Sequence, residues 1–247
     1  MFDFSSLTSG DPGAIIVALV AFGAGLIRGF TGFGGPAFML AILTIFFSPI
    51  SIVSKILVVD FFTSIYLFKI CYRHIDWRST MTMVLPTLLF IPLGQWVLYE
   101  MDPIWMKRLM AAIIALACIL MLIGYRYKRP LSAAGLIVIG AMAGIVFGGS
   151  YIALVAVVAI LLGPYNKDQG RTLIIAWSFF TVLGFAAVSI FSGITTMTDI
   201  KIALPGAASY MFGAWLGSMG FRQSSEKLFR RGSIGTLLIL SLFNLLN

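Results

Sequence analysis

The sequence predicts an all-α polytopic membrane protein, and three observations lead to this fold class. Of the 247 residues, 60% are hydrophobic and 11% are charged, and the mean hydropathy is +1.03. A soluble domain of this length would not have enough polar side chains to cover its apolar core. Turn residues and charges divide the chain into about ten apolar segments, most of them near the roughly 20 residues of a membrane-spanning helix. The two halves of the chain also contain the same short sequence signals in the same order.

The apolar segments follow one another with short connections. In chain order they cover residues 14–33, 36–47, 50–70, 80–99, 105–125, 132–147, 151–162, 171–191, 200–220 and 228–246. The second and seventh segments are too short to cross, because at 1.5 Å per residue they reach only about 18 Å. Glycines join each of them to the preceding segment, in "GFGGP" and "FGGSY". We therefore expect two hairpins that turn inside the membrane, where irregular backbone lines a cavity or is buried in protein.

The same short signals recur in the same order in the two halves. "FGG" begins at Phe33 and Phe147, and "FFT" begins at Phe61 and Phe179. These spacings predict a repeat of roughly 115 residues, with residues 1–130 and 131–247 as its two copies. Each copy holds about five segments, and five is an odd number, so the second copy would enter the membrane inverted, as in many transporters. The two hairpin tips would then meet near the midplane.

The distribution of Lys and Arg predicts the orientation. If the N-terminus lies outside and the segments alternate, most cations fall in the inner loops, as the positive-inside rule requires. The inner cations are Lys69, Arg73, Arg78, Arg126, Lys128, Arg129, Lys167, Arg171, Arg222, Lys227, Arg230 and Arg231, and the outer ones are Lys107, Arg108 and Lys201. The net charge of +8 is therefore interpreted as a topology signal rather than as a sign of nucleic-acid binding. Both termini are predicted outside.

The sequence argues against several function classes. Cys71, Cys118 and His74 have no metal-ligand spacing, so no metal site or disulfide framework is predicted. No Walker A sequence is present, which argues against direct ATP use. Asp60 is the one carboxylate in the middle of a segment and has no histidine at its depth, so an intramembrane enzyme is disfavoured. No cofactor is predicted, and the expected partners are a small anion and the lipid bilayer.

The break "RGFTGFGGPAFML" at residues 28–40 predicts an anion site. Glycines let a ligand approach the backbone, and the N-terminus of the following helix favours negative charge. Arg28 adds a full positive charge beside this break. The residues predicted to contact substrate are Arg28, Thr31, Gly34, Gly35, Lys55, Gln95, Gly148, Gly149, Ser150, Arg171 and Trp177, and Ser178 is a further hydrogen-bonding candidate.

Each of these residues also has a structural interpretation. Asp60 is either a proton-coupling group or the structural ion-pair partner of Lys55 or Arg28. Arg28 could instead cap the carbonyls at the end of its own helix. Lys55 and Arg171 could extend towards the nearest interface. The Ser and Thr hydroxyls could bond back to their own helices, and the aromatic side chains could simply pack.

These motifs resemble those of the sulfite exporter TauE/SafE family of bacterial membrane proteins. The resemblance is carried by "GFTGFGGPAFML", "GIVFGGSYIAL" and the "IDWR" run at residues 75–78. It implies a multi-pass inner-membrane exporter of a small sulfur-containing anion, such as sulfite, sulfoacetate or another organosulfonate. Alternating access, with or without proton coupling, is the expected mechanism, and the alternative is an uncoupled anion channel. Typical members have a longer glycine run, so the bulkier tip here suggests a less common substrate.

One further stretch suggests close helix contact. "GAASYMFGAWLGSMG" at residues 206–220 has the small-residue spacing that lets two helix backbones approach each other. The contact could lie within the chain or between the subunits of a homodimer.

Overall fold

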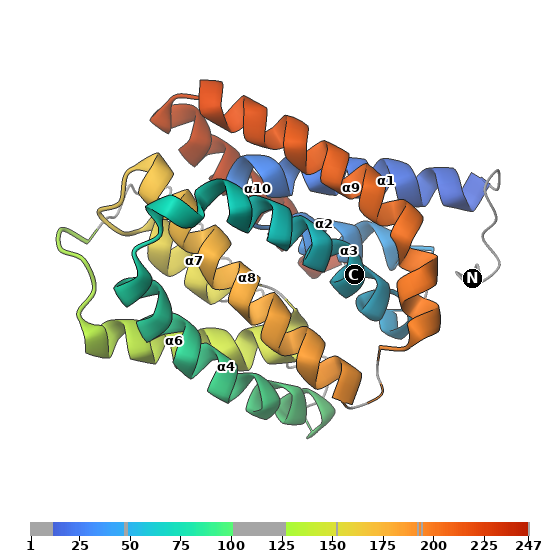
Figure 1. Cartoon of the computed structure of the whole chain (residues 1–247), viewed down its shortest axis with the longest axis horizontal. Coiled ribbons are helices and arrows are strands. Elements are labelled where there is room, and N and C mark those ends of the chain that lie inside the picture. The colour runs from blue at the N-terminus through green and yellow to red at the C-terminus, as the bar shows by residue number, and fades with distance from the viewer. Residues whose placement is uncertain are drawn as a thin grey trace.

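The fold was taken from a computed structural model, which describes residues 12–46, 49–100, 127–151, 153–191, 193 and 195–246. All regular structure in these residues is helical, which confirms the all-α prediction (Figure 1). The elements are α1 (Pro12–Thr31), α2 (Gly35–Leu43), α3 (Pro49–Cys71), the 3-10 turn η2 (Tyr72–His74), α4 (Trp77–Glu100), α6 (Ala133–Ser150), α7 (Leu154–Leu161), α8 (Lys167–Phe191), α9 (Met197–Gln223) and α10 (Glu226–Leu246). The predicted segment at 105–125 lies outside the described residues, as do Lys107, Arg108 and Arg126.

Local sequence signals set several helix ends. The Ser132 hydroxyl accepts the Gly135 N–H at the start of α6. Thr196 and Asp199 form a capping box at the start of α9, in which each side chain accepts the other residue's backbone N–H. These contacts satisfy N–H groups that the first turn of a helix leaves unpaired.

The two short helices are shorter than the sequence predicts. α2 has nine residues and α7 has eight. The α1–α2 break contains Gly32 and Gly34, with φ of 86° and 81°. The second break begins at Tyr151, so Gly148 and Gly149 lie in the last turn of α6 rather than at a hairpin tip, which corrects the predicted position. The reason is packing: a side chain at Gly148 would place its Cβ 2.3 Å from the Ile91 carbonyl oxygen on α4.

Two pairs of helices pack with their backbones in close contact. α1 lies along α9, and α4 lies along α6, with α3 and α8 between the two pairs (Figure 1). Glycines make both contacts possible. Between α1 and α9, a Cβ at Gly25 would lie 2.1 Å from the Tyr210 carbonyl oxygen, and one at Gly213 would lie 2.2 Å from the Phe22 carbonyl oxygen. Between α4 and α6, a Cβ at Gly94 would lie 2.2 Å from the Ile145 carbonyl oxygen. The glycine-rich stretch of α9 therefore makes its close contact within the chain.

Large apolar side chains cover much of the exterior, as lipid contact requires. Phe191 is 91% exposed, and Leu19, Leu85, Leu89 and Trp96 are exposed as well. Judged by length and composition alone, one helix in the described part of the chain, α8, is long and apolar enough to cross a membrane, and α1 and α6 contain shorter apolar stretches.

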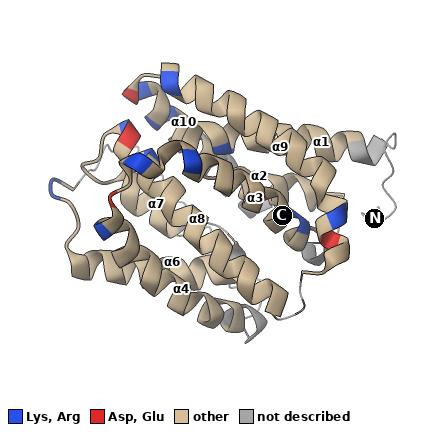
Figure 2. Cartoon of the chain, in the orientation of Figure 1, with Lys and Arg blue, Asp and Glu red and all other residues tan. Residues whose placement is uncertain are grey.

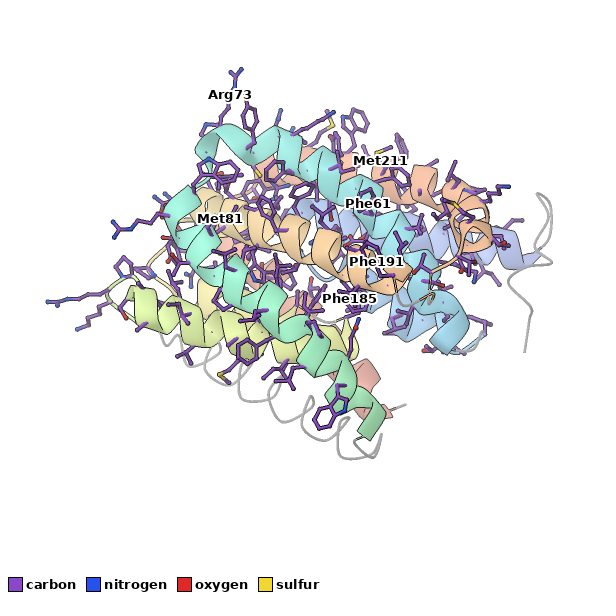
Figure 3. The ribbon with its side chains drawn as sticks, turned by 60° about the horizontal axis from the view of Figure 1, so that its bottom comes forward. Phe61, Arg73, Met81, Phe185, Phe191 and Met211 are labelled. Carbon is purple, nitrogen blue, oxygen red and sulfur yellow. The ribbon has the colours of Figure 1, made fainter. Side chains whose placement is uncertain are left out.

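Charged residues gather at one end of the helix bundle. Most of the Lys and Arg shown in Figure 2 lie where α7 meets α8, where α9 meets α10 and around η2. Figure 3 shows Arg73 of η2 projecting away from the helices at this end. The α8–α9 connection lies at the other end, with Asp199 and Lys201. The connections predicted to lie on the inner side thus share one end of the molecule.

Candidate functional site

A buried group of polar side chains lies beside the α1–α2 break, and we call it the central cluster: Arg28, Asp60, Ser64, Ser178 and Tyr210. Arg28 is only 2% exposed and lies in the last turn of α1. Its Nε lies 3.1 Å from Asp60 Oδ1, and its Nη2 lies 3.0 Å from the Ser64 hydroxyl. Nη1 donates to the Gly32 carbonyl and, at 3.3 Å, to the Ser178 hydroxyl. Three helices, α1, α3 and α8, therefore meet at one guanidinium group.

Asp60 is held by two donors from other helices. It lies in the middle of α3 and is 1% exposed, and Arg28 is its ion-pair partner. The Tyr210 hydroxyl on α9 donates to Asp60 Oδ1 at 3.0 Å. A buried carboxylate is tolerated only when it is paired and hydrogen-bonded in this way. Of the two structural partners that the sequence allows for Asp60, the structure selects Arg28 rather than Lys55.

The start of α2 packs directly on the central cluster. A Cβ at Gly35 would lie 2.2 Å from the Tyr210 hydroxyl and 2.8 Å from Arg28 Cβ, so only glycine fits there. Gly34 adopts the left-handed conformation before α2, and Pro36 occupies its first turn. The helix N-terminus, which favours negative charge, thus begins beside the buried arginine, as the sequence predicts.

Arg171 on α8 is a second buried arginine, close to the first. Its Nη2 donates to the Gly29 carbonyl at 2.5 Å and to the Ser218 hydroxyl at 3.0 Å. Its guanidinium carbon lies 4.2 Å from the centre of the Phe221 ring. No described acidic side chain forms an ion pair with Arg171, and no described atom partners its Nε. Gly32 in the α1–α2 break lies between the two arginines. Its carbonyl accepts a hydrogen bond from Arg28 Nη1, and a Cβ built on it would lie 3.3 Å from Arg171 Cγ.

Comparison with known proteins identifies the family. The family model described as Sulfite exporter TauE/SafE matches residues 17–244, and so includes every residue of the central cluster. The chain belongs to this family. It is therefore a membrane transporter of the sulfite-exporter class, and the resemblance seen in its motifs is confirmed. No curated protein and no solved structure matches the chain.

Lys55 and Gln95, which the sequence predicts for substrate contact in this TauE/SafE chain, are not members of the central cluster. Lys55 Nζ lies 2.9 Å from Asp199 Oδ1, near the start of α9, and also lines a small cavity between α1, α2, α3 and α9. Gln95 lies half-buried on α4. Ser150 ends α6, and its side chain is outside the described residues.

Two other predicted residues support the TauE/SafE fold around the cluster. The Thr31 hydroxyl lies 2.8 Å from the Ile27 carbonyl and 2.7 Å from the Phe33 carbonyl, so it stabilises the α1–α2 break. The Trp177 indole donates to the Thr87 hydroxyl at 3.0 Å and is fully buried. These contacts are of the back-bonding and packing kinds that the sequence leaves open for Thr and aromatic residues. No group of side chains suited to a metal ion gathers in the part of the chain that the structure describes.

Two residues of the central cluster, Ser64 and Tyr210, were not among the site residues predicted from the sequence. Ser64 lies one helical turn after Asp60, a spacing that places both side chains on the same face of α3. That signal was available in the sequence. Tyr210 has a weaker signal, since it is a single hydroxyl-bearing aromatic residue among the small residues of α9.

Proposed function

We propose that this TauE/SafE protein is a secondary transporter that exports a small sulfur-containing anion, such as sulfite, sulfoacetate or another organosulfonate, by alternating access. The observation that carries the proposal is the buried Arg28 beside the first turn of α2. A guanidinium group, neighbouring hydroxyls and a helix N-terminus together suit an oxyanion, whose oxygens accept several hydrogen bonds. Arg171, buried without a described acidic partner, provides a second cation on the side towards the charged end of the bundle.

We further propose that transport is coupled to a proton carried by Asp60. In the structure Arg28 is already paired with Asp60, so an arriving anion competes with that carboxylate. Arg28 would then face both Asp60 and the anion, and Arg171 lies across the α1–α2 break, so one guanidinium group would meet two negative charges in a low-dielectric interior, at high cost. Protonation of Asp60 as the anion binds keeps the loaded site neutral. The proton then travels with the anion, and the outward concentration gradient of the anion drives the export of both.

The architecture we propose is two inverted repeats, residues 1–130 and 131–247, with α1–α2 and α6–α7 as hairpins that turn inside the membrane. The helix contacts support this architecture. α1 of the first repeat corresponds to α6 of the second, and α4 corresponds to α9, so the α1–α9 contact corresponds to the α6–α4 contact, and each joins one repeat to the other. Glycines serve both contacts: Gly25 and Gly213 lie where α1 meets α9, and Gly94 and Gly148 lie where α4 meets α6. Such exchange of partners is expected of a duplicated unit.

We propose the bacterial inner membrane as the location, with the cation-rich end of the bundle on the cytoplasmic side and both termini outside. The charge distribution in Figure 2 supports this orientation through the positive-inside rule. Since the small residues of α9 are used against α1, a homodimer would form through another surface.

Reconstitution into proteoliposomes tests the proposal. We expect saturable flux of hydrogensulfite or an organosulfonate that an imposed pH gradient changes and that Arg28→Ala abolishes. For a monovalent anion, transport with one proton is electroneutral, so flux should not respond to an imposed membrane potential. An uncoupled uniporter or channel would respond strongly, by about 2.3 kcal/mol per charge per 100 mV. Absence of flux for every sulfur anion tested would overturn the substrate class.

A further inference from the structure

Tyr151, at the break between α6 and α7, has a backbone conformation that is unusual for its residue type. Its φ of 57° makes it the one non-glycine with positive φ in the described part of the chain. Its N–H donates to the Phe147 carbonyl at 2.7 Å and ends α6. Helices that end in this way normally use Gly or Asn, because a larger side chain is strained there. Strained residues persist mainly at functional sites.

The Tyr151 hydroxyl is buried without a hydrogen-bond partner among the described residues. The residue is only 6% exposed. Two rings fix its aromatic ring, with centroids 5.0 Å away for Phe147 and 4.9 Å away for Phe185. Buried hydroxyls are nearly always hydrogen-bonded, since an unpaired one loses its contacts with water and gains nothing. A rigidly held, unpartnered donor is therefore suited to a ligand.

The hydroxyl belongs to the same region as the central cluster. Tyr151 packs on Phe147, whose ring centroid lies 5.8 Å from that of Trp177, and Trp177 directly precedes Ser178 of the cluster on α8. It reaches this region from the second hairpin, whereas Arg28 and Gly35 reach it from the first. The two breaks therefore place different chemistry at one place: a cation from α1 and a neutral donor from the α6–α7 break.

We propose that the Tyr151 hydroxyl is a substrate-binding group that donates a hydrogen bond to one oxygen of the transported sulfur oxyanion while Arg28 binds its charge. The inference rests on the proposed anion transport and adds a ligand from the second hairpin. It also explains why a strained tyrosine stands where glycine would fit more easily. Binding at two separated points favours anions with several oxygens, such as sulfite and sulfonates, over a monatomic halide.

Tyr151→Phe tests the proposal, because it removes the hydroxyl and leaves the ring packing in place. We expect the KM for hydrogensulfite or methanesulfonate flux to rise about 10- to 100-fold, the range for losing a hydrogen bond to a charged group. In the absence of substrate, the thermal stability of the variant in detergent should equal or exceed that of the original chain. The substrate-induced rise in unfolding temperature should shrink, since that rise follows the affinity.

Ser233→Ala is the matched control, because Ser233 is another buried hydroxyl without a described partner, on α10. Its KM should stay unchanged. If Tyr151→Phe transports with an unchanged KM, or unfolds at a clearly lower temperature without substrate, the hydroxyl is structural and the inference is wrong. If the original chain shows no saturable flux of either anion, the proposed function fails first, and the inference fails with it.

Discussion

Asp60→Asn should destabilise the protein strongly, because it leaves the Arg28 charge buried without its partner. Nε of Arg28 lies 3.1 Å from Asp60 Oδ1, and both residues are almost fully buried. Two unit charges about 4 Å apart attract by about 4 kcal/mol at an effective dielectric constant near 20. Measured losses on breaking one partner of a buried pair are about 3–5 kcal/mol. We expect a loss of that size in the free energy of unfolding in detergent.

A double-mutant cycle separates this pair from simple loss of packing. Arg28→Met alone should also destabilise, whereas the double variant with Asp60→Asn should lose at least about 2 kcal/mol less than the sum of the single changes. Glu226→Gln is the control, since Glu226 pairs with Arg230 at 3.6 Å on an exposed helix face, where such pairs contribute about 0.5 kcal/mol or less. If the effects of Asp60→Asn and Arg28→Met add without coupling, the buried pair is not the stabilising unit described here.

Three further outcomes are expected. Gly25→Ala and Gly148→Ala should each destabilise by about 1–3 kcal/mol, because the new Cβ would overlap a backbone carbonyl of the partner helix. Gly170→Ala should be neutral or stabilising in the same unfolding assay, since the nearest atom there is 3.8 Å away. In the loop before α4, hydrogen bonds from Ser79 lower the pKa of Asp76 below its usual 3.8. Asp76 thereby caps the start of α4, since its carboxylate accepts the Ser79 N–H. The stability that this cap contributes is present above about pH 4 and is lost as the pH falls through the lowered pKa of Asp76 in the folded protein. Asp76→Asn should flatten this acid-side dependence of the unfolding temperature, and an unchanged profile would refute the capping role.

The all-α fold class and the position of the first break could be predicted from the sequence because both depend on local chemistry. Apolar segments bounded by turn residues become helices, and "GFGGP" contains the glycines and proline that end one helix and begin the next. Arg28 could be placed at that break by its position alone. The family resemblance was also visible in these local motifs.

Contacts between distant parts of the chain could not be predicted in the same way. Tyr210 donates to Asp60 across 150 positions of sequence, and no periodicity encodes that pairing. The second break was expected at Gly148 and Gly149 because glycine is the usual helix terminator. Gly148 instead allows the close approach of α4, and Tyr151 takes the position with positive φ. The identity of a glycine does not show whether the backbone turns there or another helix passes close by.

The glycine contacts between paired helices have a mechanical consequence. At the glycine positions where the α1 and α9 backbones touch, no side chain lies between them that could change its rotamer. The two helices should therefore move as one rigid unit. The same holds for α4 and α6. Motion that opens the protein to one side of the membrane and then to the other would therefore occur at the softer contacts around α3 and α8. Arg28 belongs to the α1–α9 pair, whereas Asp60 and Ser178 belong to α3 and α8. The Arg28–Asp60 ion pair therefore crosses the interface at which the helices would move relative to each other.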